Sequence, residues 1–266
     1  MEYEFDLVGK IGSMALIRKE DQDIDYNIFS RLGAELRPGM IWVTSGATEI
    51  GRLDYLKRTG CELCGDPEQD KADYSSQGQA ILMQNYRQFI PQEYGIRQIL
   101  VEHTHFNDPE KCEHIRQLLI RSARQKTIPI VNYNDPVSDE ENRKMELAVR
   151  REKGGEVHEC VDNDETAAVI AGLVHAKTLV LMTSTEGIYS DPKDPSTLIP
   201  RSTVDEAAAL KEQGIISGGM IPKVGCCVEA ISRGVRKVII MDGRIPHSIL
   251  LELFTDEGAG TMVTPV

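Results

Sequence analysis

The sequence predicts an α/β fold in three layers, with a mostly parallel central sheet between two layers of helices. Two observations support this prediction. Short apolar runs alternate along the chain with longer amphipathic segments, as strands and helices do in a parallel sheet. The apolar runs are continuous rather than alternating with polar residues, as expected of strands covered on both faces.

The predicted strands are aliphatic, and they are Phe5–Val8, Met40–Val43, Gln98–Val101, Ile128–Val131, Thr178–Met182 and Lys237–Met241. The predicted helices carry apolar residues at helical spacing, and they are Asp25–Leu36, Ser76–Phe89, Pro109–Arg124, Asp164–His175, Ser202–Glu212, Lys223–Arg233 and Pro246–Phe254. Two stretches are less regular, Thr59–Tyr74 and Ser138–Glu159. The second is densely charged, and it predicts either a flap or hairpin or a solvated helix.

Length and composition limit the classes of function. With 266 residues, 41% hydrophobic and 27% charged, the chain can bury a full core as a single domain over residues 1–266. A net charge of −12 argues against a nucleic acid partner, because such binding needs a cationic face. No apolar run approaches the roughly 20 residues that span a bilayer. The N-terminus is acidic and lacks a secretory pattern, so we expect a cytoplasmic protein without a membrane partner.

Cysteine and histidine spacing gives no strong metal signal. Cys61 and Cys64 have CxxC spacing, but no second pair follows at zinc-finger distance, which favours reduced thiols. His103 and His105 lie two apart at the end of an apparent strand, so they are expected to share a face. A third candidate ligand is missing at readable spacing. We therefore expect no protein-held metal site.

The residues that follow the predicted strands are the candidates for chemistry, because ligands bind at the carboxyl ends of parallel strands. Small and polar residues gather there, in Gly9–Ser13, Thr44–Gly51, Asn132–Pro136, Asp162–Asp164, Thr183–Pro192 and Gly218–Lys223. Each segment alone is equally typical of a turn or a helix cap. Together, with Lys10 and Lys223 among them, they predict a site for a polyphosphate and a small polar acceptor. Neither a Walker A run nor a protein-kinase motif is present.

These segments resemble the amino acid kinase superfamily over nearly the whole chain. The parts similar to glutamate 5-kinase are Lys10–Ser13 with Val43–Ala47, Gly78–Tyr86, and Pro129–Asp135 with Asp162–Asp164. The parts similar to N-acetylglutamate kinase are Gly218–Val224, Met241–Arg244, Leu250–Asp256 and Gly260–Met262. The resemblance implies an α/β/α sandwich whose residues 1–160, approximately, bind the acceptor and whose residues 161–266 bind ATP.

The activity that the resemblance implies is transfer of a phosphoryl group from ATP, with Mg²⁺, to the side-chain carboxylate of a small acidic amino acid. Glutamate is the expected acceptor, and amino-acid biosynthesis, of proline in particular, the expected context. The resemblance also implies a homo-oligomer. Three alternatives stay open: an N-acetylglutamate or related N-acyl acid kinase, a nucleoside monophosphate-type kinase of the same fold, and a non-catalytic nucleotide-binding regulatory homologue.

Roles carry over from the family by position. Lys10 and Lys223 would flank the transferred phosphoryl group, and Asp164 would hold both lysines. The acceptor would contact Gly12, Ser45, Gly46, Ala47, Asn134, Asp135 and Asn163. The nucleotide would contact Thr183, Ser184, Gly187, Ile188, Tyr189, Asp191, Gly219 and Met220.

The sequence departs from both parent patterns at several positions. Thr44–Ala47 stands where N-acetylglutamate kinases have a glycine-rich loop, and the arginine with which they hold their substrate has no clear counterpart. Ser184 stands where both families have an aspartate. Met14 and Tyr133 replace a small polar and an acidic residue of glutamate 5-kinase. Substrate choice is expected to depend on the N-terminal half. The motifs therefore predict the reaction better than they predict the substrate.

Overall fold

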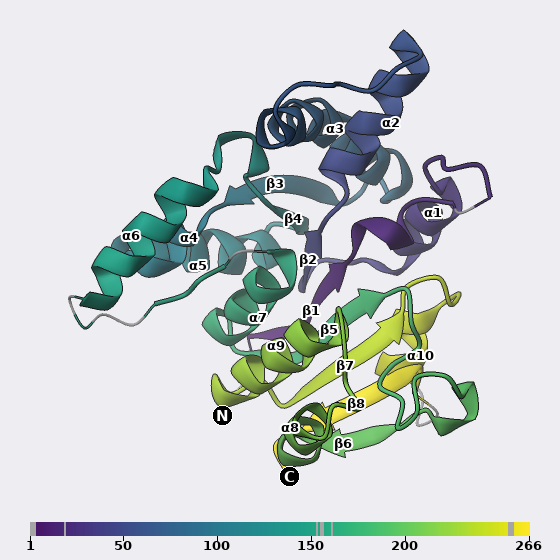
Figure 1. Cartoon of the computed structure of the whole chain (residues 1–266), viewed down its shortest axis with the longest axis vertical. Coiled ribbons are helices and arrows are strands. Elements are labelled where there is room, and N and C mark those ends of the chain that lie inside the picture. Colours follow the sequence, from purple (N-terminus) through teal and green to yellow (C-terminus); the bar gives the residue numbers. More distant parts are fainter. Residues whose placement is uncertain (1–3, 19, 153, 155–156, 161, 255–257) are drawn as a thin grey trace.

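The described part of the chain contains the predicted sheet, with eight strands rather than the six predicted, and with helices on both faces (Figure 1). The structure, a computed structural model, describes residues 4–18, 20–152, 154, 157–160, 162–254 and 258–266. Its strands are β1 (Phe5–Ile11), β2 (Met40–Thr44), β3 (Gly95–Val101), β4 (Thr127–Tyr133), β5 (Ala176–Thr183), β6 (Arg201–Thr203), β7 (Lys237–Asp242) and β8 (Gly260–Thr264). Their order is β3-β4-β2-β1-β5-β7-β8-β6, and neighbours are parallel except β7 and β8.

Two hydrophobic clusters, one on each face of the sheet, join the sheet to a layer of helices on either side, which gives three layers. Helices α1, α2 and α3 cover one face around the buried Trp42, and α5, α7 and α9 cover the other. The helices are α1 (Tyr26–Glu35), α2 (Ala47–Thr59), α3 (Pro67–Phe89), α4 (His103–Asn107), α5 (Pro109–Arg124), α6 (Glu140–Glu152), α7 (Asn163–Leu173), α8 (Val204–Glu212), α9 (Met220–Ser232) and α10 (Ser248–Phe254). This arrangement confirms the predicted fold class.

All six predicted strands are present, but the sequence reading missed β6 and β8. Strand β8 alternates between buried and half-buried residues and runs antiparallel to β7, so it lacks the continuous apolar run used to find the others. Strand β6 has only three residues and lies at the edge of the sheet. The predicted helix from Ser202 starts later, at Val204, because Ser202 belongs to β6 and Thr203 caps α8.

The two irregular stretches are largely helical. Helix α3 begins at Pro67, where the Asp66 side chain caps the helix by accepting from the backbone N–H of Glu68 and Gln69. Of the alternatives for Ser138–Glu159, the helix is the one observed, as α6; residues 153, 155 and 156 lie outside the described part of the chain. Residues 255 and 256 of the predicted C-terminal motif also lie outside it.

The described residues bear on the expectations about histidine placement, metal sites and membrane spans. His103 and His105 lie in the short helix α4 rather than on a strand, so the prediction that they share a strand face is wrong. Across the described ranges, no group of three or more His, Cys, Asp or Glu side chains is placed to hold a metal ion. Within the same ranges, no helix has the length and apolar character needed to cross a bilayer.

Candidate active site

The carboxyl ends of β1, β2 and β5 meet at one edge of the sheet, as the sequence predicts. The parallel register pairs Lys10 with Val43 of β2 and with Leu181 of β5. Ile11 pairs with Thr44 and Met182, so Ser45 and Thr183 come next to Gly12, two residues after Lys10. Helix α7 packs across the same strands and brings its first turn to this edge.

Asp164, in that first turn, joins two lysines that are far apart in the sequence. Its Oδ1 lies 2.7 Å from Lys10 Nζ, and its Oδ2 lies 2.6 Å from Lys223 Nζ in the first turn of α9. Asp162 fixes the backbone here by accepting from the N–H of Asp164 and of Glu165 at 2.8 and 2.9 Å. The three predicted catalytic residues are thus in direct contact, although their roles stay a prediction.

The charge state of this group follows from its surroundings. Burial raises the pKa of the Asp164 carboxyl, but the charges and hydrogen bonds of Lys10 and Lys223 outweigh burial and hold that pKa below its usual value. The side chains of Lys10, Asp164 and Lys223 are 8%, 7% and 16% exposed. One carboxylate therefore positions two ammonium groups that have little contact with solvent.

Three adjoining cavities lie along this edge. The α2–α7 cavity, about 360 Å³, is lined by Lys10, Ser13, Ser45, Gly46, Ala47, Thr48, Glu49, Lys71, Asn132, Tyr133, Asp135, Asp162 and Asn163. The α9 cavity, about 370 Å³, is lined by Thr183, Ser184, Thr185, Gly187, Ile188, Tyr189, Pro192, Ile215, Ile216, Ser217, Gly219, Met220 and Lys223. The central cavity, about 200 Å³, contains both Lys10 and Lys223 and shares residues with each of the others.

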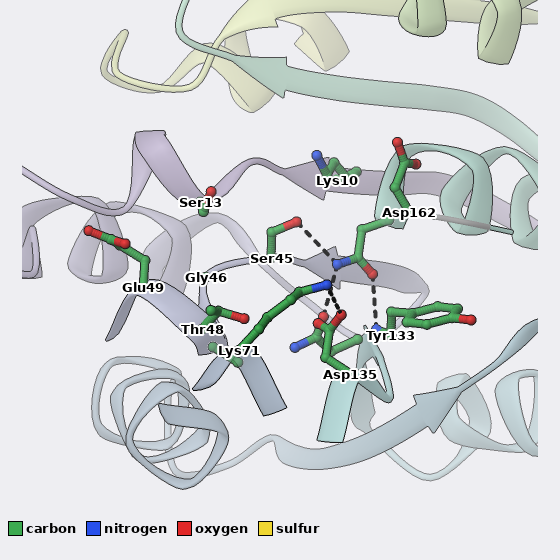
Figure 2. Close-up of a pocket in the computed structure, with 13 residues that line it drawn as sticks. Lys10, Ser13, Ser45, Gly46, Thr48, Glu49, Lys71, Tyr133, Asp135 and Asp162 are labelled. Carbon is green, nitrogen blue, oxygen red and sulfur yellow. Dashed lines mark hydrogen bonds and ion pairs between the residues drawn. The ribbon is translucent and has the colours of Figure 1, made fainter. Parts of the chain in front are cut away.

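Two buried amide side chains, those of Asn132 and Asn163, line the α2–α7 cavity, and dashed lines at Ser45 and Tyr133 in Figure 2 mark hydrogen bonds made there. The Asn163 amide donates to Ser45 Oγ at 3.1 Å and to Asn132 Oδ1 at 2.9 Å, and its oxygen accepts from the N–H of Tyr133. Asn132 in turn donates to Gln79 Oε1 at 2.8 Å. Because Asn163 donates to the Ser45 oxygen, the Ser45 hydroxyl hydrogen is left to donate to a ligand.

Lys71 is the cavity residue that the sequence analysis missed. Its Nζ lies 2.9 Å from Asp135 Oδ1, and the carboxylates of Glu49 and Asp162 also line the cavity. Lys71 belongs to α3 and lies in the stretch predicted to be irregular. The signal that could have placed it in a helix is the cap at Asp66 followed by proline.

A close contact between α2 and α3 sets the position of Lys71. A Cβ atom added at Gly78 would lie 1.8 Å from the carbonyl oxygen of Ala47, and one at Gly51 would lie 1.8 Å from that of Tyr74. The backbones of the two helices therefore touch at these glycines. This packing, on the turn of α2 that lines the cavity, carries the N-terminal part of α3 to the cavity.

The structure gathers most, but not all, of the predicted binding residues. Ser45, Gly46, Ala47, Asp135 and Asn163 line the α2–α7 cavity, and Gly12 lines the central one. The Asn134 amide instead donates to Glu102 Oε1 at 2.8 Å, and Asn134 is not among the residues that line the cavity; Asn132 is.

The predicted nucleotide residues gather around the α9 cavity, apart from Asp191. Its carboxylate accepts from the backbone N–H of Lys193 within the same loop, and it is not part of the cavity lining. Arg244, which follows β7, anchors the other end of that loop. Its guanidinium donates to both carboxylate oxygens of Asp242 and to the carbonyl oxygen of Ser184, the last at 2.7 Å.

The amino acid kinase family model matches residues 7–242. The chain belongs to this family. An acetylglutamate kinase of Heliobacterium modesticaldum is 55% identical to it over 103 residues, which are 39% of this chain and 35% of that protein. The match thus spans about a third of the length of such curated relatives.

Solved structures with a similar fold superpose on nearly the whole chain. Carbamate kinase from Giardia lamblia bound to AMP-PNP superposes with a TM-score of 0.62, at 15% identity and over 98% of both chains. N-acetylglutamate synthase from Neisseria gonorrhoeae complexed with coenzyme A and L-arginine also gives 0.62, at 16% identity, over 99% of this chain and 62% of that one. At such identities the likeness concerns the fold alone.

Proposed function

We propose that this amino acid kinase phosphorylates the side-chain carboxylate of an acidic amino acid, or of its N-acetyl derivative, with ATP. The observation that carries the proposal is the contact of Asp164 with Lys10 and Lys223, the two lysines that line the central cavity. The two larger cavities adjoin it, one on the side of each lysine. One cavity would hold the acceptor and the other ATP, with the γ-phosphate between the lysines.

The reaction needs charge and position more than it needs a base. A carboxylate oxygen of the acceptor attacks the γ-phosphorus of ATP, the bond from that phosphorus to the β,γ-bridging oxygen breaks, and ADP leaves. The product is an acyl phosphate. Negative charge spreads over the equatorial oxygens in the transition state, where two ammonium groups stabilise it. The acceptor is ionised at pH 7, so no proton has to be removed.

The α9 cavity has the chemistry expected of a site for an adenine nucleotide. Ile188, Ile216 and Met220 give it apolar walls for a flat base, and Lys223 lies at its border with the central cavity. Gly187 is packed closely, since a Cβ there would lie 2.4 Å from Thr261 Oγ1. Together these features place an apolar pocket next to a cation, as ATP requires.

The donor set around the lysines indicates how Mg²⁺ would be held. Asp164 is paired with two lysines. Among the described residues that line the central cavity, the oxygen-bearing side chains are the hydroxyls of Ser13, Ser45, Thr183 and Ser184. A hard cation that keeps several waters fits such a site when the phosphates supply its anionic ligands. When bound, Mg²⁺ would neutralise part of the negative charge of the phosphates.

N-acetylglutamate is the first candidate acceptor. The curated relatives with the matching 103 residues are acetylglutamate kinases, which favours the same acceptor here. The α2–α7 cavity also offers hydrogen-bond donors to a carboxylate. The Ser45 hydroxyl is one, and the first N–H groups of α2, which has no side-chain cap at Gly46, are others.

Free glutamate is the second candidate, and one observation favours it. Three carboxylates line the cavity, from Glu49, Asp135 and Asp162. They suit an acceptor with an ammonium group, which glutamate has and N-acetylglutamate lacks. A nucleoside monophosphate is disfavoured, because the described residues of the lining include no arginine to hold its phosphate. The intact contact of Asp164 with both lysines disfavours a non-catalytic homologue.

The decisive experiment traps the acyl phosphate with hydroxylamine while ADP release is followed. The acceptors are glutamate, N-acetylglutamate, aspartate and 2-aminoadipate. We expect hydroxamate from one or both of the first two, in step with ADP. ATP binding without hydroxamate from any acid would refute carboxylate-kinase chemistry and support a regulatory homologue.

A further inference from the structure

We propose that Lys71 binds the second, non-reacting carboxylate of the acceptor and so makes the site selective for dicarboxylates. The inference rests on the proposed function and names the substrate class of the same site. Its basis is the distribution of charge in the α2–α7 cavity. Among the described residues that line this cavity, the cations are Lys10 and Lys71.

Lys10 lies where the reacting carboxylate of the acceptor would meet the phosphoryl group. Its ammonium is nearly buried and lies against Asp164, beside the central cavity where the phosphoryl group would pass. Lys71 belongs to helix α3, whereas Lys10 belongs to strand β1. The Lys71 ammonium points into the cavity toward Asp135 (Figure 2). Two separated cations in one cavity suit an acceptor with two carboxylates.

Lys71 has capacity for a ligand. Its side chain is 58% exposed, and one N–H is used on Asp135. An ammonium group has three donors, so two remain for a carboxylate oxygen. The Asp135 contact holds the long side chain over the cavity, which reduces the rotamer entropy lost on binding.

The acidic part of the lining makes a cation necessary here. Asp162 would repel a second carboxylate that met no positive charge, and Glu49, whose carboxylate is paired with Arg52, would add a smaller repulsion. Lys71 offsets this repulsion at one place, and so it fixes where that carboxylate can sit. An acceptor without a second carboxylate gains nothing from Lys71.

The test compares the wild type and Lys71→Met on two acceptors, one with and one without the second carboxylate. The acceptor is whichever of glutamate or N-acetylglutamate is active, and its partner is the same molecule without the α-carboxylate, 4-aminobutyrate or N-acetyl-4-aminobutyrate. For the dicarboxylate we expect Lys71→Met to lower kcat/KM by about 10- to 100-fold, the usual scale for a charged hydrogen bond. For the monocarboxylate we expect the variant to match the wild type, and Lys71→Arg should retain most of the activity.

Lys57→Met is the matched control. Lys57 is 55% exposed and pairs with Asp23 at 2.6 Å, much as Lys71 pairs with Asp135, but it lies outside the three cavities. It should leave kcat/KM unchanged for both acceptors. An equal loss with both acceptors in Lys71→Met, or no loss with either, would overturn the inference.

The inference and the proposed function fail in different ways. If the wild type gives no hydroxamate with any acid, the proposed function fails. Isothermal titration with glutamate and with N-acetylglutamate, each compared with its counterpart that lacks the α-carboxylate, then repeats the comparison on binding alone. A dicarboxylate that binds the wild type about 10-fold or more tightly than Lys71→Met supports the inference even then. A dicarboxylate that does not bind, or binds both proteins equally, refutes it.

Discussion

Replacing Asp164 with asparagine should both destabilise the protein and abolish most of its activity. The substitution keeps the shape but removes the charge that pairs Lys10 at 2.7 Å and Lys223 at 2.6 Å. Two nearly buried ammonium groups are then uncompensated, which costs about 3–5 kcal/mol when a buried ion pair is broken. At about 2–4 °C per kcal/mol for a domain of this size, the melting temperature should fall by about 6–20 °C.

The assay is thermal unfolding by circular dichroism over a range of pH, with Asp21→Asn as control. Because the folded-state pKa of Asp164 is lowered, its contribution is complete above the unfolded value of about 3.9 and is lost as pH falls through the lower folded value. The difference in melting temperature between wild type and variant should stay constant from neutral pH to about pH 5 and close only in stronger acid. Asp21 pairs with Arg18 at the same 2.6 Å but is exposed, so the control should melt like the wild type. An Asp164→Asn protein with the melting temperature and turnover of the wild type would refute the reasoning.

Three further substitutions examine the proposed roles. Lys223→Met should lower kcat by about 10²–10³-fold in the coupled ADP assay, the scale for one lost transition-state contact, and near-normal kcat would remove it from the mechanism. Asp135→Asn should raise KM about 10-fold for glutamate, whose ammonium it would no longer attract. KM for N-acetylglutamate should rise less, because that acceptor loses only the positioning of Lys71 by Asp135; equal effects would exclude the contact with the ammonium. Gly187→Ala should lower stability by about 1–3 kcal/mol and raise KM for ATP, because its Cβ would lie 2.4 Å from Thr261 Oγ1; unchanged thermal unfolding would show that the loop yields freely.

The parts of the fold that the sequence predicts are those where burial leaves a local pattern. Strands β1, β2, β4 and β5 are almost fully buried, so they read as continuous apolar runs. Strand β8 has one buried residue in every two, and its pairing with β7 depends on a long-range antiparallel contact. No local sequence pattern indicates that contact, so β7 is the last strand that the sequence predicts.

The same distinction applies to the site. Lys10, Ser45 and Thr183 could be brought together from the sequence, because parallel strands align their carboxyl ends. The contact of Asp164 with both lysines needed the family resemblance, since no local spacing relates these three residues. Asn134 and Asn132 are two residues apart on one segment, and which of them faces the cavity depends on where β4 ends, at Tyr133. Element ends are what sequence patterns determine least well.

Lys71 shows how packing alone can create a specificity residue. Nothing near it in the sequence is related to the strand ends, and its place at the cavity follows from the contact of α2 and α3 at Gly51 and Gly78. Any side chain at either glycine would push the helices apart, because the nearest atoms are backbone carbonyls. Such a shift would move Lys71 away from Asp135. The glycines of a helix contact can therefore control acceptor binding without touching the acceptor, and their substitution should raise KM for a dicarboxylate even where the fold is retained.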